Sequence, residues 1–402
     1  MSEICATRGD GIVFSEPLYA RGAFPEGTEW SRQLRVCSPC VGLDAPRRAG
    51  LEIGVTWIGT DVCDLRRDVR VALERLPGTD GNMMLGEIAG DVSLRDTSSM
   101  QDAEALVSGP PCPPYSSIGS LGLGQDARSC ILDIVGRWAL VLAQRGCLLF
   151  FVLENVEGLF KRQAGQEASY GTLLVDWMST SLPKGWKVKV MRANTRDCGV
   201  PQCRPRVFII GVSPAMLRTP LQKRLWDRPL RQCRPVSLRE VLAPCDKPED
   251  YESLTLNQKL NVAARLDEWE AIRKTRTPHG ELGVVDIARD ASKVGFDSAF
   301  GFDECHTFRT NNSHLWVVPA IHLRATYGAH GRFLTWQEKA RLSGIAPRSL
   351  EGMSVAGIQS ALGNTIPVPL IGSVLAPLLQ AWREVYRSEL LGNDSSPADG
   401  VE

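Results

Sequence analysis

The sequence predicts an α/β fold, a doubly wound, mostly parallel sheet with a smaller domain of irregular structure beside it. From residue 33 to residue 212, short apolar runs alternate with amphipathic segments, as strands and helices do in such sheets. The run CLLFFVL at 147–153 is apolar on both faces, which is typical of a central strand covered by helices. After residue 212 the alternation stops, and the chain becomes rich in Arg, Pro, Asp and Asn with weak periodicity.

The apolar runs and the helical spacing define the expected elements in chain order. Strands are predicted at Leu34 to Cys37, Ile53 to Gly59, Ala105 to Val107, Cys147 to Leu153, Lys187 to Met191 and Val207 to Ile210. Helices are predicted at Asp64 to Leu76, at Ser129 to Gln144 and, near the end of the chain, at Leu370 to Leu390. Ligands of such sheets bind at the carboxyl ends of the strands, so we expect functional side chains just after these runs.

The composition is that of an intracellular globular protein. The 402 residues can form more than one core, and 43% hydrophobic and 23% charged residues are ordinary proportions. No stretch reaches the length of a membrane span, and residues 1–30 lack the pattern of a signal peptide. The 12 cysteines are scattered along a long chain, and we interpret them as reduced thiols. We expect a monomer without a membrane partner, located in the cytoplasm of a bacterium or the nucleus of a eukaryote.

A local basic segment is the candidate nucleic-acid contact. The formal net charge of the whole chain is zero, so binding to a polyanion would need a local patch. Such a patch is predicted at residues 223–239, where Arg224, Arg228 and Arg231 lie among other cations and near Trp226. A solvated basic face is the alternative interpretation.

The stretch GPPCPPYSSIG at 109–119 contains the candidate nucleophile, Cys112. Proline fixes the backbone φ angle and donates no backbone hydrogen bond, so the turn around this thiol is stiff. The Ser- and Gly-rich residues that follow, to about Gln125, can move as a lid. A fixed nucleophile beside a mobile cover suits covalent catalysis on a bulky substrate. The alternative is an inert cysteine in a proline-rich turn.

Several blocks, in order along the chain, resemble the cytosine-5 DNA methyltransferase family, whose members depend on S-adenosylmethionine. GPPC with a following aromatic residue and Ser is similar to the catalytic loop of that family. The further blocks are FVLENVEGLF at 151–160, DCGVPQCRPRVFIIGV at 197–212, GRFLTWQEKARLSGI at 331–345 and LGNTIPVPL at 362–370. One such block is a weak signal, but the whole series in register is specific.

The resemblance implies a sheet of the S-adenosylmethionine-dependent methyltransferase type and a division of the chain. Residues 33–212, completed by 352–390, correspond to the catalytic methyltransferase domain. Residues 213–351 correspond to a target-recognition domain of irregular structure. Residues 1–32 form an N-terminal extension without a motif, and residues 391–402 form a polar tail that we expect to be disordered.

The resemblance also implies roles in methyl transfer to carbon 5 of cytosine. Cys112 is the nucleophile that adds to carbon 6 of the ring. Glu154 acts at ring nitrogen 3, and desolvation at the end of a strand is expected to favour its neutral form. Arg206 contacts the cytosine carbonyl oxygen, and Arg204 braces the loop or a phosphate. Gln202 helps to order the catalytic loop. The alternatives are an acid near a helix start for Glu154 and a pair of surface arginines.

The implied cofactor is S-adenosylmethionine, and here the sequence departs from the family. The turn VCSPCVGLDAP at 36–46 keeps only Gly42 of the family's glycines. Asp61 is placed for the ribose hydroxyls and Asp91 for the adenine amino group, although capping is the commoner use of such residues. Asn364 and Thr365 correspond to the methionine end.

Two further departures concern cysteines and the residues after the nucleophile. Cys37 and Cys40 could be half of a metal site, but no second pair stands at zinc-like spacing, so no metal is predicted. Pro113, Pro114 and Tyr115 follow Cys112 where the family usually has Gln, Pro and Phe. Pro113 removes a backbone donor next to the thiol, which can alter rate or substrate handling.

The expected substrate is duplex DNA with the target cytosine flipped out of the helix. One alternative is the same chemistry on transfer RNA, because one branch of the family acts there. The other is a catalytically weak or inactive nucleic-acid-binding homologue, which the altered turn at 36–46 and Pro113 favour. The sequence does not define the target site or a maintenance, de novo or restriction role.

Overall fold

The structure is a computed structural model that describes residues 32–40, 42–63, 69, 91–112, 115, 128–162, 165–243, 251–273, 281–293, 300–308 and 314–391. The side chains of residues 61–63, 129, 300, 302 and 388–391 lie outside this description. A six-stranded sheet in the order β2-β1-β3-β4-β7-β5 forms the centre of the larger domain. Its strands are β1 Leu34–Pro39, β2 Trp57–Cys63, β3 Ala105–Ser108, β4 Phe150–Asn155, β5 Lys187–Asn194 and β7 Pro205–Val212. β2, β1, β3 and β4 pair in parallel, and β7 is antiparallel to both β4 and β5.

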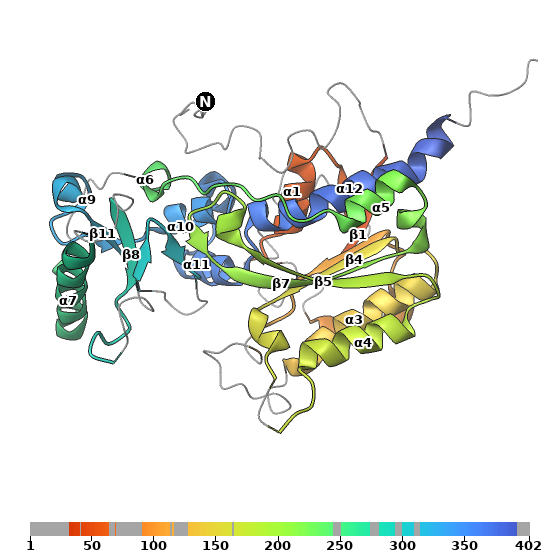
Figure 1. Cartoon of the computed structure of the whole chain (residues 1–402), viewed down its shortest axis with the longest axis horizontal. Helices are drawn as coiled ribbons and strands as arrows, with labels where there is room; N and C mark the ends of the chain where they lie inside the picture. The colour runs from red at the N-terminus through yellow and green to blue at the C-terminus, as the bar shows by residue number, and fades with distance from the viewer. Residues whose placement is uncertain are drawn as a thin grey trace, which may run out of the picture.

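Helices cover both faces of this sheet, so its central strands are buried (Figure 1). α1 (Ala45–Glu52), α5 (Pro220–Asp227) and α12 (Val368–Leu391) lie on one face. α3 (Ser129–Gln144) and α4 (Tyr170–Ser181) lie on the other. Every residue of β4 is buried, as its apolar run predicts. The fold class predicted from the alternation of strands and helices is confirmed.

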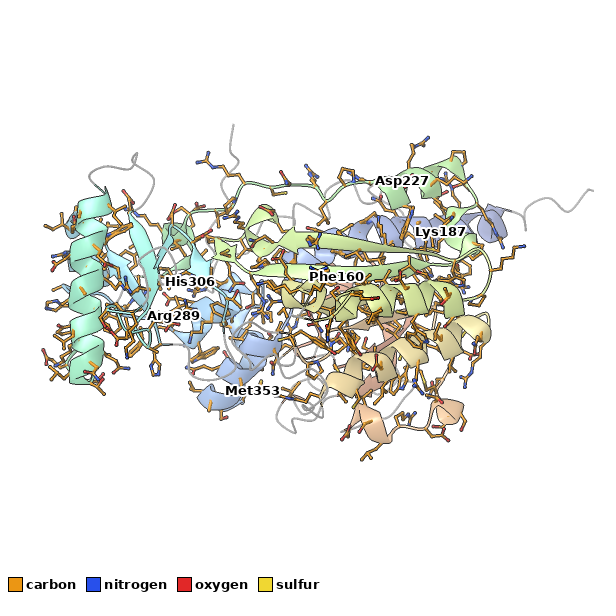
Figure 2. All side chains as sticks on the ribbon, turned by 60° about the horizontal axis from the view of Figure 1, so that its bottom comes forward. Phe160, Lys187, Asp227, Arg289, His306 and Met353 are labelled. Atoms are coloured by element: carbon orange, nitrogen blue, oxygen red, sulfur yellow. The ribbon has the colours of Figure 1, made fainter. Side chains whose placement is uncertain are left out.

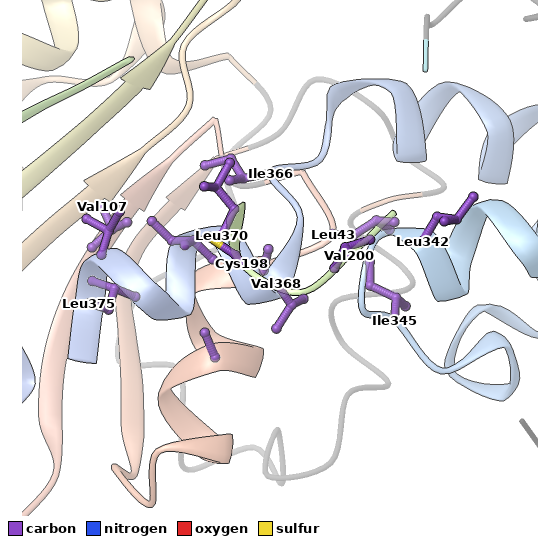
Figure 3. Packing of buried hydrophobic residues seen from close by; sticks show 14 of the residues in the cluster. Leu43, Val107, Cys198, Val200, Leu342, Ile345, Ile366, Val368, Leu370 and Leu375 are labelled. Atoms are coloured by element: carbon purple, nitrogen blue, oxygen red, sulfur yellow. The ribbon is translucent and has the colours of Figure 1, made fainter. Parts of the chain in front are cut away.

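The last helix returns to the first domain from the far end of the chain. α12 packs against α1 and α5, and its Leu370 and Leu375 share an apolar cluster with Val107 of β3 and with Cys198 (Figure 3). The predicted helix at 370–390 therefore exists and begins slightly earlier. Among the described residues, no single helix has the length and apolarity to span a membrane, whereas the bent pair of α11 (Val355–Asn364) and α12 passes on those two criteria alone.

Most predicted elements of the sheet are observed, with shifted ends. The helix at 129–144 has the predicted bounds. The second strand begins at Trp57 rather than at Ile53, because Ile53 caps α1 and Gly54 turns the chain with φ +81°. α1 was not predicted, although Pro46 in its first turn is a helix-start signal. The predicted helix at 64–76 lies, apart from Val69, outside the described residues.

The smaller domain contains more regular structure than its weak periodicity indicated. A four-stranded antiparallel sheet has the order β12-β11-β8-β9. Its strands are β8 Leu282–Asp286, β9 Phe300–Phe302, β11 Leu315–Pro319 and β12 Arg332–Phe333. α7 (Leu256–Arg273) covers this sheet, with Val262 and Trp269 in one cluster with Trp316. The other helices are α6 Leu238–Val241, α9 Arg324–Tyr327 and α10 Trp336–Leu342.

Short elements connect these two parts. β6 (Gln202–Cys203) pairs in parallel with β10 (Cys305–His306), so a block next to β7 shares backbone hydrogen bonds with the smaller domain. The 3-10 helices are η1 Val92–Leu94, η2 Thr97–Ser99, η4 Glu157–Phe160, η5 Thr195–Asp197, η6 Pro214–Leu217, η8 Ile321–Leu323 and η9 Pro347–Leu350. Figure 2 shows Lys187 of β5 and Asp227 of α5 at one end of the molecule and His306 in the smaller domain at the other.

Candidate active site

The carboxyl ends of β3 and β4 bring the candidate nucleophile and the candidate acid to one edge of the sheet. In the parallel pairing of these strands, Ser108 faces Leu153, so Glu154 follows directly beyond the end of β3. Cys112 lies in the loop that leaves β3. β7 enters this edge in the opposite direction, and its Val207 pairs with Asn155 at the end of β4. Arg206 therefore reaches the same edge as Glu154.

Glu154 and Arg206 form a buried ion pair at this edge. Glu154 Oε1 lies 2.6 Å from Arg206 Nε, and the two side chains are 9% and 7% exposed. Arg206 Nη1 also donates a hydrogen bond to the carbonyl oxygen of Pro205 at 2.7 Å. A buried charge is tolerated only where partners compensate for its lost hydration, so each of these groups holds the other in place.

Gly109 of the GPPC block lies close against Glu154. A Cβ atom at this position would lie 3.0 Å from Glu154 Oε2 and 3.4 Å from Ile366 Cδ1. Asn155 Nδ2 donates to the carbonyl oxygen of Pro110 at 3.4 Å, so the turn before Cys112 is braced by the residue after Glu154. The sequence did not single out Gly109 or Ile366, because these residues are far apart in the chain and come together only in the fold.

The environment of the Cys112 thiol is set by burial and by three charged neighbours. Burial raises the pKa of Cys112, and the negative charge of Glu154 raises it further. Arg206 and, more weakly, Arg204 lower this pKa. The thiol is thus mainly protonated at neutral pH, and its reactivity depends on how these charges are arranged.

Tyr115 anchors the described start of the loop after Cys112. Its backbone N–H donates to the carbonyl oxygen of Cys112 at 2.9 Å. Its ring is buried and packs on the ring of Tyr170 at 5.2 Å between centroids. Pro113, Pro114 and residues 116–127 lie outside the described residues, so the predicted lid is among them.

Arg204 and Gln202 lie deeper than the ion pair. Arg204 Nη2 donates to the carbonyl oxygens of Gly363 at 3.0 Å and Thr365 at 2.8 Å, and the residue is 3% exposed. This burial favours bracing over contact with a phosphate, the two roles expected for Arg204. Gln202 is fully buried in β6, and neither atom of its side-chain amide has a hydrogen-bond partner among the described residues.

The turn after β1 is tight and rests on the last motif block. Gly42 has φ +57°, a left-handed conformation that favours glycine, and a Cβ there would lie 3.4 Å from Thr365 Oγ1. The backbone N–H of Leu43 donates to that same oxygen at 3.3 Å. Gly42 and Thr365 are thus brought together, with Asn364 directly beside them in α11. The described residues contain no cluster of three or more His, Cys, Asp or Glu arranged to hold a metal ion.

Asp44 was not predicted as a site residue, yet it shapes this turn. It caps α1 in the left-handed conformation, with φ 52°, and its Oδ1 accepts from the backbone N–H of Arg47 at 3.3 Å. Burial is the main cause that raises the pKa of Asp44 to about 6. An Asp placed just before Ala-Pro is a recognisable helix-start signal and could have revealed both the cap and α1.

Of the two predicted nucleoside contacts, Asp61 and Asp91, the structure describes the side chain of Asp91 only. Asp61 lies in β2, and its side chain is outside the described residues. Asp91 caps η1, and its Oδ1 accepts from the backbone N–H and the hydroxyl of Ser93 at 2.8 and 2.7 Å. The capping use, which was the alternative for Asp91, is therefore observed, and its contact with adenine stays a prediction.

The residues around the turn fit a cofactor with an amino-acid end and a nucleoside end. Gly42 keeps the turn in its left-handed conformation against Thr365. The hydroxyl oxygens of Ser38 in β1 and Thr60 in β2 are buried and have no hydrogen-bond partner among the described residues. Buried polar atoms are normally paired, so these hydroxyls are available for a polar ligand.

Of the predicted basic contact, Arg224 and Arg228 are not brought to the site, whereas Arg231 lies two residues before Cys233, which pairs through a backbone bridge with Cys198. Arg224, Arg228 and Arg231 are exposed, and α5 packs on α12 at the end of the molecule away from the smaller domain (Figure 1). The reason is the direction of β7, whose Val212 pairs with Phe150 at the start of β4. The chain therefore leaves the sheet at the edge opposite to Cys112 before it reaches α5.

Residues 82–380 match the family model described as C-5 cytosine-specific DNA methylase. Among curated relatives, the type II methyltransferase M.NgoBI of Neisseria gonorrhoeae is 27% identical over 286 residues, 70% of this chain and 76% of that protein. M.NlaX of Neisseria lactamica is 25% identical over 74% of this chain and 83% of its own length. The match to M.DdeI of Desulfomicrobium norvegicum, 28% identical, covers 43% of this chain and only 34% of that relative.

Solved structures of low sequence identity share the fold. The Dnmt2 methyltransferase of S. pombe superimposes with a TM-score of 0.56 at 16% identity, covering 87% of this chain and 99% of that one. A DNMT2 mutant of Spodoptera frugiperda gives a TM-score of 0.57 at 15% identity, covering 86% of this chain and 100% of that one. The predicted methyltransferase fold is thereby confirmed.

Proposed function

Because this chain belongs to the C-5 cytosine-specific DNA methylase family, we propose that it methylates carbon 5 of cytosine in duplex DNA through a covalent adduct with Cys112. The family membership confirms the predicted enzyme class, a DNA (cytosine-5-)-methyltransferase. The observation that best supports the covalent route is the buried Glu154–Arg206 pair at the strand edge that also carries Cys112, whose thiol pKa responds to both charges.

Cys112 adds to carbon 6 of the flipped cytosine as a thiolate. The new carbon–sulfur bond uses the electrons of the ring's 5,6 double bond, so carbon 5 becomes nucleophilic and negative charge develops at ring nitrogen 3. Glu154, once it has taken up a proton from solvent, donates that proton or a hydrogen bond to ring nitrogen 3, and Arg206 donates to the neighbouring carbonyl oxygen. After carbon 5 has been methylated, water takes the proton from carbon 5. The electrons of that carbon–hydrogen bond re-form the 5,6 double bond, the Cys112 thiolate leaves, and the proton at ring nitrogen 3 returns to Glu154.

The turn after β1 and the segment that follows α11 hold the cofactor in this proposal. Gly42, Asn364 and Thr365 lie at its methionine end, and Asp61 and Asp91 at its ribose and adenine. When bound, S-adenosylmethionine supplies an electrophilic methyl group on a sulfonium centre. The tight conformation of Gly42 supports this assignment, as do the hydroxyls of Ser38 and Thr60, which have no hydrogen-bond partner among the described residues.

DNA recognition is divided between the two domains. Cytosine in a duplex is stacked, so the base must leave the helix to reach Cys112. We assign target recognition to residues 213–351 and catalysis to residues 33–212 together with 352–390, with Gln202 helping to order the catalytic loop. Arg224, Arg228 and Arg231 contact phosphates of DNA that extends beyond the target site. We propose a monomer that acts inside the cell.

The test is transfer of labelled methyl from S-adenosylmethionine to duplex DNA and to transfer RNA in parallel reactions, with Cys112→Ala as the control. We expect label on DNA and none with the variant. Label on transfer RNA alone would replace the substrate, and transfer by Cys112→Ala would remove the covalent route. A folded protein that labels neither would favour the non-catalytic homologue, with Pro113 and the turn at 36–46 as the suspected causes.

A further inference from the structure

The segment 363–366 touches both halves of the candidate active site. On one side, Thr365 Oγ1 accepts a hydrogen bond from the backbone N–H of Leu43 at 3.3 Å, and the turn at Gly42 packs against the same side chain. On the other side, Ile366 and Glu154 flank Gly109, because a Cβ atom added at Gly109 would lie 3.4 Å from Ile366 Cδ1 and 3.0 Å from Glu154 Oε2. Consecutive residues of one short segment therefore lie between the Glu154–Arg206 pair and the turn at Gly42 and Leu43, which we call the cofactor turn.

Arg204 fixes this segment by its backbone. Its Nη2 donates to the carbonyl oxygens of Gly363 and Thr365, at 3.0 and 2.8 Å. These carbonyls lie at the end of α11, where the last C=O groups of a helix lack partners within the helix and where a positive charge is favoured. The guanidinium thus donates to two carbonyl oxygens at this helix end.

The burial of Arg204 shows how closely it is held. Burial, with repulsion from Arg206, lowers the pKa of Arg204, while Glu154 and Cys112 oppose that shift. The same guanidinium in turn lowers the pKa of Cys112. Arg204 therefore acts electrostatically on the nucleophile and mechanically on the segment that supports the cofactor turn.

We propose that Arg204 and Thr365 are positioning residues that link the cofactor turn to the cytosine pocket. This inference rests on the proposed function. Arg204 holds the carbonyl oxygens of Gly363 and Thr365. The Thr365 hydroxyl links this segment to the backbone of Leu43, and Ile366 links it by packing to the Gly109 turn beside Glu154. The occupancy of the cofactor turn and the reactivity of Cys112 are then coupled, because either one changes the placement of the same segment.

Thr365 offers a matched pair of variants. Thr365→Val keeps the shape but removes the hydroxyl, which leaves the buried N–H of Leu43 without its acceptor. The loss of about 1 kcal/mol for one such hydrogen bond corresponds to roughly fivefold weaker binding of S-adenosylhomocysteine, measured by calorimetry. Thr365→Ser keeps the hydroxyl and should bind within about twofold of the wild type.

The second measurement is made at Cys112, on the cytosine side of the proposed link. Iodoacetamide labelling of Cys112, followed on its peptide by mass spectrometry, reports the thiolate without needing DNA or turnover. Because burial is the main cause that raises the pKa of Cys112, a loosened segment admits water and lowers that pKa. We expect labelling at pH 7 to rise at least about threefold in Thr365→Val, to stay unchanged in Thr365→Ser, and to fall back when Thr365→Val is saturated with S-adenosylhomocysteine.

Arg204→Lys tests the link from its centre, since it keeps the charge and loses the two-carbonyl fork. It should weaken S-adenosylhomocysteine and increase labelling of Cys112 together, with thermal unfolding as the check that the variants fold. If Thr365→Val binds S-adenosylhomocysteine more weakly but leaves Cys112 labelling unchanged, or if the Ser and Val variants behave alike, the link is wrong. Failure of the folded wild type to bind S-adenosylhomocysteine would instead contradict the proposed function.

Discussion

Neutralising Glu154 should make Cys112 more reactive and the enzyme less active. In Glu154→Gln, Arg206 loses the carboxylate that lies 2.6 Å from its Nε in a pair whose side chains are under 10% exposed. Removing one partner of a buried pair costs about 3–5 kcal/mol. The amide oxygen of Gln can still accept a hydrogen bond from Arg206, so we expect about 3 kcal/mol, seen as a lower midpoint of urea unfolding.

Reactivity of Cys112 should rise while methyl transfer falls, and this distinguishes the loss of the Glu154 charge from a general loss of stability. Glu154 raises the pKa of Cys112, whereas Arg206 and Arg204 lower it. Without the carboxylate the two cations prevail, the pKa falls, and iodoacetamide labelling at pH 7 increases, by about threefold for half a pKa unit. Methyl transfer should nevertheless fall by about 10²–10⁴, the usual contribution of a general acid.

The assays are peptide mass spectrometry of Cys112 across pH 6–9 and labelled methyl transfer on the same preparations. Glu157→Gln is the matched control, because it removes the same charge from an exposed residue of η4. It should leave both measurements at wild-type values. Unchanged or slower labelling of Cys112 in folded Glu154→Gln would refute the electrostatic reasoning, and undiminished methyl transfer would refute the role of Glu154.

Three further predictions concern other parts of the chain. Burial raises the pKa of Asp44 from 3.8 to about 6, so the contribution of its protonated form to stability is present below pH 4 and is lost as pH rises through 6. Asp44→Asn should therefore add up to about 3 kcal/mol to the unfolding free energy at pH 8 and nothing at pH 4. An equal effect at both pH values would contradict this prediction. Glu338→Gln removes the carboxylate charge that lies 2.6 Å from Arg332 in a buried pair, and it should cost about 3 kcal/mol. The exposed capping variant Glu240→Gln should cost less than about 1 kcal/mol, and equal losses in urea unfolding would argue against the buried pair. Replacing Arg224, Arg228 and Arg231 together by Gln should reduce the slope of log affinity for DNA against log salt by about 2 to 3, and an unchanged slope would remove them from the contact.

The spacing of apolar residues predicted the elements whose structure follows from their own short stretch of sequence. The helix at 129–144 follows from its apolar spacing, and the central strand from a run that is apolar on both faces. The sheet of the smaller domain was missed because its strands are short, for example Arg332–Phe333, and take their order from pairings between distant segments. Strand lengths of this kind leave too few residues for a period to be recognised.

The site was predicted in part for the same reason. The motif blocks identified Cys112, Glu154 and Arg206, which lie close to strand ends. They could not identify the acceptors of Arg204, which are 159 and 161 residues further along the chain. Nor could proximity in sequence show that Arg224 and Arg228 belong to a segment that starts at the opposite edge of the sheet, because that depends on the antiparallel direction of β7.

The pairing of β6 with β10 joins the two domains close to the catalytic groups. Cys305 and His306 align with Gln202 and Cys203, and the backbone N–H of Cys305 donates to the carbonyl oxygen of Pro201 at 2.8 Å. This contact lies within a few residues of Arg204, so backbone hydrogen bonds join the two domains beside the catalytic groups. These backbone hydrogen bonds restrain movement between the two parts next to Arg204, so we expect the catalytic groups to keep their geometry while DNA binds.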